Sequence, residues 1–181
     1  AAQSVTLWVD SSKSMGFSGD KSRPPKSDRA HLIAAALAVL LLRAGERVGL
    51  VGQSAPPRPG RAQLLRLAAL MASADGSAEY GSPSADGMVS HGRAVLLSDF
   101  FGDMAPVEAT LAAAAEHGVR GALIQVLDPA EEEFPFNGRT IFESMGGGVR
   151  HETQQADELR TRYLARLAER KDRIASLARA T

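Results

Sequence analysis

The sequence predicts an α/β protein with a three-layer, doubly wound and mostly parallel sheet that has helices on both faces. The first observation is the run 5–9 (VTLWV), a β-branched and aromatic stretch of strand length that stops at Asp10. The second is the run 94–99 (AVLLSD), which is again an apolar strand that ends on a carboxylate, Asp99. The third is the alternation of such strands with Ala- and Leu-rich helical stretches, which indicates parallel strands joined by right-handed crossovers.

The central elements follow from apolar spacing and from residues that start or stop helices. Asp28 is placed to cap a helix that is apolar on nearly all sides, and Gly45 is placed to end it. The following helix has a face of leucines, and Gly118 ends the next one. In order, we expect a helix over 29–43, a strand over 48–52, a helix over about 61–73, the helix before Gly118, and a strand over 122–127.

The pattern changes after residue 128. Residues 139–143 and 149–153 flank the glycine-rich stretch 145–148, which predicts a β-hairpin near the C-terminus. The acidic run 131–133 is expected to be solvated, since adjacent carboxylates do not converge on one point. We expect four apolar side chains to cover one end of the sheet, namely Phe134, Phe136, Ile141 and Phe142. A long final helix carries one apolar stripe made of Leu159, Tyr163, Leu167, Ile174 and Leu177.

Composition narrows the function classes. The 181 residues are enough for one domain, 1–181, which we expect to be a fragment of a longer chain. Lys plus Arg and Asp plus Glu are equal at 21 each, and this balance argues against nucleic acid as a partner. The absence of cysteine excludes disulfides and thiolate metal sites, and it agrees with a cytoplasmic location. The longest apolar run, 32–42, is too short to span a membrane, so no membrane segment is expected within this fragment.

The turn after the first strand carries the strongest chemical signal. Asp10, Ser12 and Ser14 follow the strand at alternate positions, so their oxygens can converge on one point. A carboxylate with two hydroxyls is a hard-oxygen donor set suited to Mg²⁺ or Mn²⁺. Asp99 would meet Asp10 across the crevice if the two strands are neighbours where the strand order reverses. The alternative is that each residue only caps or stabilises its own turn.

With Asp10-x-Ser12-x-Ser14 after one strand and Leu97-Ser98-Asp99 after a later one, the chain resembles a von Willebrand factor A (vWA) domain. The stretches LLLRAGERVGL (40–50), LSDFFG (97–102) and QVLDPAEEEFPFNG (125–138) are similar to the bacterial domain-of-unknown-function family 58. That family is often associated with MoxR-type AAA+ ATPases. The resemblance covers most of the chain and implies a Rossmann-like, vWA-type sheet.

The resemblance also implies a metal-ion-dependent adhesion site (MIDAS). In such a site Ser12 and Ser14 would hold Mg²⁺ directly, and Asp10 and Asp99 would act mainly through water. The vWA pattern adds a threonine from a middle loop, where this sequence offers Ser77, with Ser82 or Ser84 as alternatives.

The sequence is compatible with three functions. The first is a non-catalytic interaction module whose metal captures an acidic residue of a protein partner, which by the resemblance belongs to a MoxR-type ATPase system or is its substrate. The second is a haloacid-dehalogenase-like, Mg²⁺-dependent phosphatase with Asp10 as nucleophile; Ser12 stands where that chemistry normally needs a second carboxylate. The third is a metal-free scaffold that binds through its long helix and hairpin.

Overall fold

A parallel sheet of four strands forms the centre of the computed structural model, which describes residues 1–180. Position 181, the last of the predicted domain, lies outside the described residues. The strand order is β2-β1-β3-β4 and every neighbouring pair is parallel. The strands are β1 (Ser4–Val9), β2 (Arg47–Leu50), β3 (Arg93–Ser98) and β4 (Arg120–Gln125). The predicted α/β, doubly wound fold class is therefore confirmed.

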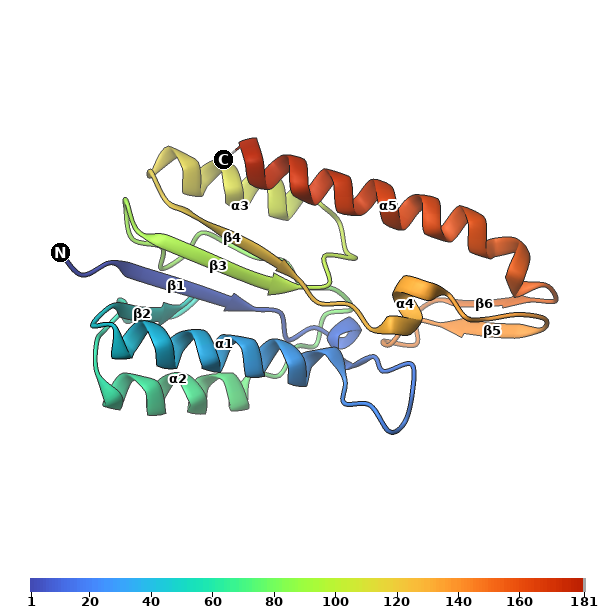
Figure 1. Cartoon of the computed structure of the whole chain (residues 1–181), viewed down its shortest axis with the longest axis horizontal. Coiled ribbons are helices and arrows are strands. Elements are labelled where there is room, and N and C mark those ends of the chain that lie inside the picture. The colour runs from blue at the N-terminus through green and yellow to red at the C-terminus, as the bar shows by residue number, and fades with distance from the viewer. Residues whose placement is uncertain (181) are drawn as a thin grey trace.

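Helices cover both faces of this sheet, which gives three layers (Figure 1). One face carries α1 (Lys26–Arg43) and α2 (Arg61–Ser73), and the other carries α3 (Ala105–Glu116) and the long α5 (Ala156–Ala180). Alternate strand residues supply the two cores, as the pleat of a sheet requires. Leu7 and Leu97 are fully buried on the α1 side, whereas Leu96 packs with Val107 and Ile174 on the other.

The first long helix begins earlier than its sequence pattern predicts. α1 starts at Lys26 after Pro25, whose extended backbone takes the N-cap position, so the predicted N-cap Asp28 is wrong. Asp28 lies instead in the first turn, where a carboxylate is favourable near the positive end of the helix dipole. The extra turn carries Lys26 into the protein interior, where it is buried. The predicted bounds of the strands differ from the observed ones by one or two residues.

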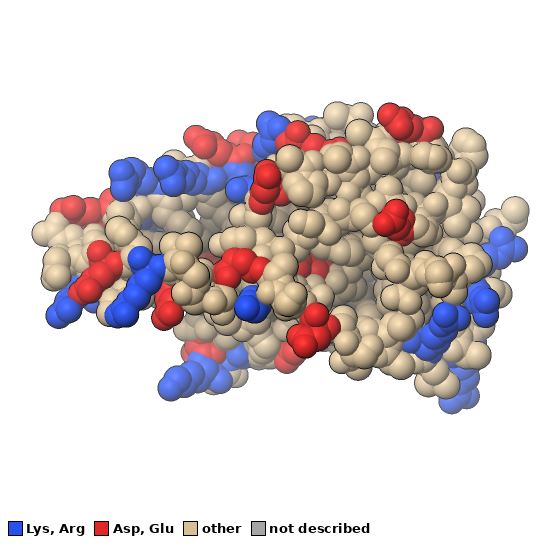
Figure 2. Space-filling view, turned by 180° about the vertical axis from the view of Figure 1, so that it is seen from behind, with Lys and Arg blue, Asp and Glu red and all other residues tan. Residues whose placement is uncertain are grey.

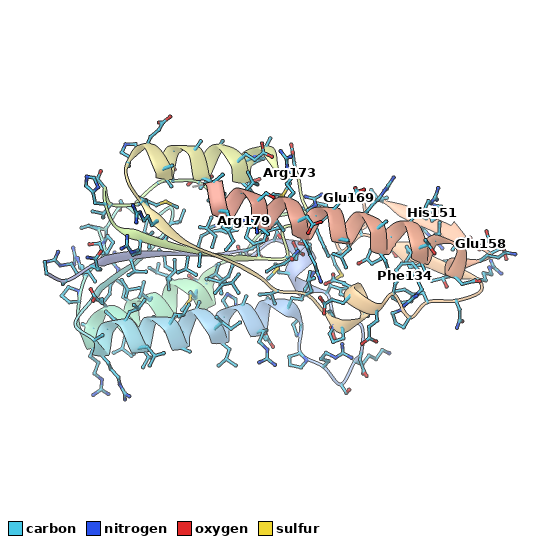
Figure 3. All side chains as sticks on the ribbon, turned by 45° about the horizontal axis from the view of Figure 1, so that its top comes forward. Phe134, His151, Glu158, Glu169, Arg173 and Arg179 are labelled. Carbon is cyan, nitrogen blue, oxygen red and sulfur yellow. The ribbon has the colours of Figure 1, made fainter. Side chains whose placement is uncertain are left out.

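The C-terminal third places a small aromatic cluster beyond the carboxyl ends of the strands. The short helix α4 (Pro129–Glu133) and the antiparallel hairpin β5 (Thr140–Glu143) and β6 (Arg150–Thr153) lie there, with the start of α5 alongside (Figure 1). The ring centre of Phe134 lies 5.5 Å from that of Phe142 and 4.7 Å from that of Tyr163. Figure 3 shows Phe134 under the N-terminal half of α5. The predicted cluster is confirmed except for Ile141, which is exposed because it is on the outer face of β5.

The surface is mixed in charge. Acidic and basic side chains are interspersed over the face shown in Figure 2, with broad uncharged areas between them. Within residues 1–180, no helix has the length and apolarity needed to cross a membrane.

Candidate functional site

The predicted site lies where the strand order reverses. β1 pairs with β2 on one side and with β3 on the other, so the loops that leave β1 and β3 diverge at their carboxyl ends. Val9 is in register with Leu97, and the Asp10 amide donates a hydrogen bond of 2.9 Å to the Leu97 carbonyl. This register brings Asp10 beside the end of β3, which meets the condition under which Asp10 and Asp99 are expected to share one crevice. The turn residues Ser12 and Ser14 follow on the same edge.

Asp10 is a buried carboxylate held by two hydrogen bonds. Only 1% of the residue is exposed. Its Oδ1 accepts a bond of 2.8 Å from the Ser12 amide, and its Oδ2 accepts one of 2.6 Å from the Ser98 hydroxyl. No Lys, Arg or His among residues 1–180 forms an ion pair with it. Buried carboxylates are normally paired with a cation or coordinate a metal, so Asp10 lacks the usual compensation.

Ser12 and Ser14 form a buried pair of hydroxyls next to Asp10. Their Oγ atoms are 3.1 Å apart. In an octahedral Mg²⁺ site with metal–oxygen distances of about 2.0–2.1 Å, adjacent ligands are about 2.9 Å apart. The 3₁₀ turn η1 (Lys13–Gly16) sets this spacing, and the amides of Lys13 and Ser14 are anchored to the carbonyls of Ala78 and Glu79. The donor set therefore fits a small divalent cation in both chemistry and spacing.

Asp99, the second predicted carboxylate, is paired with a buried lysine. Lys26 Nζ donates to Asp99 Oδ2 at 2.8 Å and to Glu131 Oε1 at 2.7 Å. The rings of Phe17 and Phe101 lie 5.8 and 5.1 Å from Lys26 Nζ, within the range of cation–π attraction. Asp99 Oδ1 also accepts the Phe101 amide. Asp99 is thus compensated by the chain itself, in contrast to Asp10.

Glu131 is part of the site and not of a solvated run, which corrects the prediction for the acidic stretch 131–133. Its Oε2 accepts the Asp128 amide while Asp128 Oδ1 accepts the Ala130 amide, so the two residues form a capping box around α4. Arg23 also donates to Asp128 Oδ1, which ties the loop before α1 to α4. Burial raises the pKa of Glu131, and Lys26 only partly offsets this. Glu132 and Glu133 are exposed, as expected.

The middle loop, between α2 and β3 (74–92), reaches the site, but among the described residues its predicted serine, Ser77, has no side-chain hydrogen bond that would hold it there. Ser77 is exposed, and within residues 1–180 its hydroxyl forms no hydrogen bond; Ser82 is likewise exposed. Ser84 accepts the Asp86 amide within its own loop. The residue that approaches Asp10 is Gly81, where an added Cβ would lie 2.3 Å from the Asp10 Cγ atom. The loop therefore covers the carboxylate closely because it has no side chain at this position.

Tyr80, next to Gly81, stands at the mouth of the site. Its pKa is raised by partial burial and by the negative charges of Glu79 and Asp99. The site's electrostatics are dominated by carboxylates: Lys26 faces Asp99 and Glu131, and Asp10 adds a further negative charge. A divalent cation would balance the negative charge that Lys26 leaves uncompensated.

Sequence reasoning missed three side chains that organise the site. Ser98 directly precedes Asp99 in the motif LSDFFG, but the predicted site includes only Asp99. The Ser98 side chain at the end of β3 nevertheless reaches Asp10. Lys26 directly follows Pro24 and Pro25, and this Pro-rich context is typical of an exposed loop and gives no sign of a buried lysine. Glu131 could have been distinguished from its acidic neighbours by the Asp-Pro-Ala-Glu spacing of a capping box. Residues 1–180 contain no cluster of three His, Cys, Asp or Glu side chains able to hold a metal, so a metal here would depend on the serine hydroxyls.

Comparison with known proteins identifies a family. No curated protein sequence matches the chain significantly. A solved structure described as the conserved hypothetical protein BatB from Bacteroides thetaiotaomicron has a TM-score of 0.48 and 14% identity, covering 92% of this chain and 85% of that one. An aerotolerance-related membrane protein from Bacteroides fragilis NCTC 9343, with multiple mutations to serines, has a TM-score of 0.47 and 15% identity, covering 98% of each chain. The family model described as "Protein of unknown function DUF58" matches residues 1–173, and the chain therefore belongs to this family.

Proposed function

We propose that this domain is a non-catalytic protein-interaction module that uses a vWA-type, MIDAS-like site to capture an acidic residue of a partner. Ser12 and Ser14 would hold Mg²⁺ or Mn²⁺ directly, and Asp10 and Asp99 would support it mainly through water. Ser77 is the proposed loop hydroxyl, reached only if its exposed loop moves toward the metal. The partner we propose is a protein of a MoxR-type AAA+ ATPase system or a substrate of that system.

The observation that carries this proposal is the unpaired burial of Asp10 beside the hydroxyl pair. A carboxylate that is 1% exposed and that forms no ion pair with any of residues 1–180 is costly to bury. Among residues 1–180, the two hydroxyls at 3.1 Å next to it form a hydrogen bond only with each other. A divalent cation at this point would relieve the cost at Asp10 and would use both hydroxyls.

The donor set also supports binding over catalysis. When bound, the metal would supply an electrophilic centre whose charge the neutral hydroxyls do not neutralise, so that a carboxylate from outside could complete its coordination. The chain's own groups hold the site in place: Ser98 orients Asp10, and Lys26 orients Asp99. No second carboxylate stands two residues after Asp10, where a haloacid-dehalogenase-like phosphatase would need its general acid.

A metal-free scaffold is the second candidate, and one observation favours it. Lys26 already places a positive charge on Asp99, so half of the proposed site is compensated without metal. In that case the hydroxyl pair would be part of a rigid turn only. The two proposals differ in whether Asp10 and Ser14 matter for binding a cation.

Calorimetric titration of Mn²⁺ and Mg²⁺ into metal-stripped protein tests the proposal. We expect saturable binding by the natural sequence that is lost in Ser14→Ala, because one direct ligand is removed while the fold keeps its core. Ser90→Ala is the matched control, since this exposed serine precedes β3 at the other end of the sheet. Equal binding by Ser14→Ala, or no binding by the natural sequence, would reject the metal site. Turnover of p-nitrophenyl phosphate that depends on Mg²⁺ and Asp10 would reject the non-catalytic assignment.

A further inference from the structure

A groove with apolar walls opens directly beside the hydroxyl pair. Its volume is about 230 Å³, many times the ~10–15 Å³ that one water needs on the same measure. Ser14 belongs to its lining, so the groove and the proposed metal site share a residue. Part of its lining comes from Phe17 and Phe101, near Lys26, and part from the aromatic cluster around Phe134, which forms the aromatic wall.

The aromatic wall is built as a rigid surface. Phe134 is buried, stacks on Phe142 and meets Phe136 edge to face at 5.1 Å. The Tyr163 hydroxyl donates a bond of 2.6 Å to the Glu131 carbonyl, which fixes α5 against α4 at this point. Phe134 thus contacts both Tyr163 on α5 and Phe142 on β5. A wall of this kind needs little reordering to accept a ligand, and this lowers the entropic cost of binding.

Two large side chains on the groove remain accessible although they border the buried site. Tyr80 is 42% exposed and Met145 is 46% exposed, and both line the groove. The Met145 Cε atom lies 3.6 Å from the Cβ position that Gly16 would have, so the hairpin tip reaches over η1. Aromatic residues and methionine are the types enriched where proteins bind other proteins.

The charges at the edge of the groove indicate what else the ligand carries. Glu79 and Glu143 both line it, and within residues 1–180 neither forms an ion pair. Within the described part of the chain, the Glu79 carboxylate accepts a hydrogen bond from the Gly146 amide alone, which joins the loop before β3 to the hairpin tip. A partner with a Lys or Arg at this point would be complementary in charge.

From this juxtaposition we infer that the groove between η1, α4 and the β5–β6 hairpin is a specificity pocket for a peptide segment of the partner. The segment has an acidic residue for the metal, an aromatic or large aliphatic side chain for the apolar groove, and a basic residue for Glu79 and Glu143. The acidic part of this inference rests on the proposed function. The apolar and basic parts rest on the groove alone.

Selection of phage-displayed random dodecapeptides on the immobilised domain in Mg²⁺ tests the inference. We expect enriched sequences to combine all three residue types. A synthetic copy of the strongest binder, labelled for fluorescence anisotropy, then gives dissociation constants for the variants. Met145→Ala and Glu143→Gln change exposed side chains, so folding is not at risk, and each should weaken binding about five- to tenfold. Val149→Ala is the control on the same hairpin, exposed but outside the groove, and should leave affinity unchanged.

The outcomes separate the groove from the metal site. Peptide binding that needs Mg²⁺ and Ser14 but has the same affinity in Met145→Ala and Glu143→Gln would overturn the groove's role as a specificity pocket and leave the proposed function in place. Binding that is weakened by the groove variants but unaffected by EDTA and by Ser14→Ala would overturn the proposed function and the acidic part of the inference. No enrichment over a surface without the domain would overturn the whole inference.

Discussion

Replacement of Lys26 by methionine removes one charge from the centre of the site without opening a cavity. The Lys26 side chain is 2% exposed, and its ammonium lies 2.8 Å from one Asp99 oxygen and 2.7 Å from one Glu131 oxygen. Methionine is of similar length and can fill the same space between Phe17 and Phe101. What the substitution leaves behind is a buried, unpaired Asp99 carboxylate.

The expected loss of stability is large for a single polar substitution. Breaking a buried ion pair by removing one partner costs about 3–5 kcal/mol, because the other charge stays buried. For a chain of this size that corresponds to a fall in Tm of about 6–20 °C. The assay is urea denaturation followed by circular dichroism at pH 7, with thermal denaturation as a second readout. The slope of the free energy of unfolding against urea concentration should not change, since the same surface is exposed on unfolding.

Lys171→Met is the matched control. Lys171 pairs with Glu132 at 2.5 Å, but the two side chains are 41% and 50% exposed. An exposed pair contributes about 0–1 kcal/mol, so this variant should be close to the natural sequence. Adding Asp99→Asn to Lys26→Met should recover part of the loss, since the unpaired charge is then gone. Equal stability of Lys26→Met and Lys171→Met would refute the buried triad.

Three further predictions follow from the packing and ionisation of single residues. Absorbance titration at 295 nm should show the Tyr163 phenol ionising late, since burial and then the charges of Glu131 and Glu132 raise its pKa to about 12. The stability linked to Tyr163 is complete below its ordinary pKa of 10 and is lost as pH rises through about 12; Tyr163→Phe should remove that part of the alkaline loss, and an unchanged alkaline profile would contradict it. Gly81→Ala should weaken Mn²⁺ binding by about tenfold or more, because its Cβ displaces the Asp10 carboxylate or the loop, whereas Gly148→Ala, in open space, should not; calorimetry decides between them. In urea denaturation, Leu7→Ala should lower the free energy of unfolding by about 2–5 kcal/mol, whereas Leu65→Ala, which changes an exposed residue, should alter it by no more than about 0.5 kcal/mol. Similar values for both variants would contradict the assigned core.

The fold is largely predictable because its signals are local. Two apolar runs that end on aspartate predict strands of one parallel sheet, and the structure adds that these two strands, β1 and β3, are neighbours. The stripe of the final helix is confirmed as well, with Leu167 and Ile174 buried. The start of α1 was missed because Pro25 provides the extended N-cap that sequence patterns assign to a polar side chain.

The site was predictable only in part, because its pairing partners are distant in the chain. Lys26 is 73 residues from Asp99 and 105 residues from Glu131, and nothing near Lys26 in the sequence indicates either contact. Glu131 stands in the same acidic run as Glu132, and its position three residues after the N-cap Asp128 is the one local signal that distinguishes it. The role of Gly81 depends on how closely one loop passes another, which no residue pattern encodes.

The proposed divalent cation would bind where the Ser12 and Ser14 hydroxyls meet beside Asp10. An anomalous difference map from crystals of the protein grown with Mn²⁺ tests this most directly, because it locates the metal without reference to any model of the site. We expect one strong peak about 2 Å from both serine oxygens, with the Lys26–Asp99 pair intact. A map with no peak there, or with the metal bound elsewhere, would contradict it.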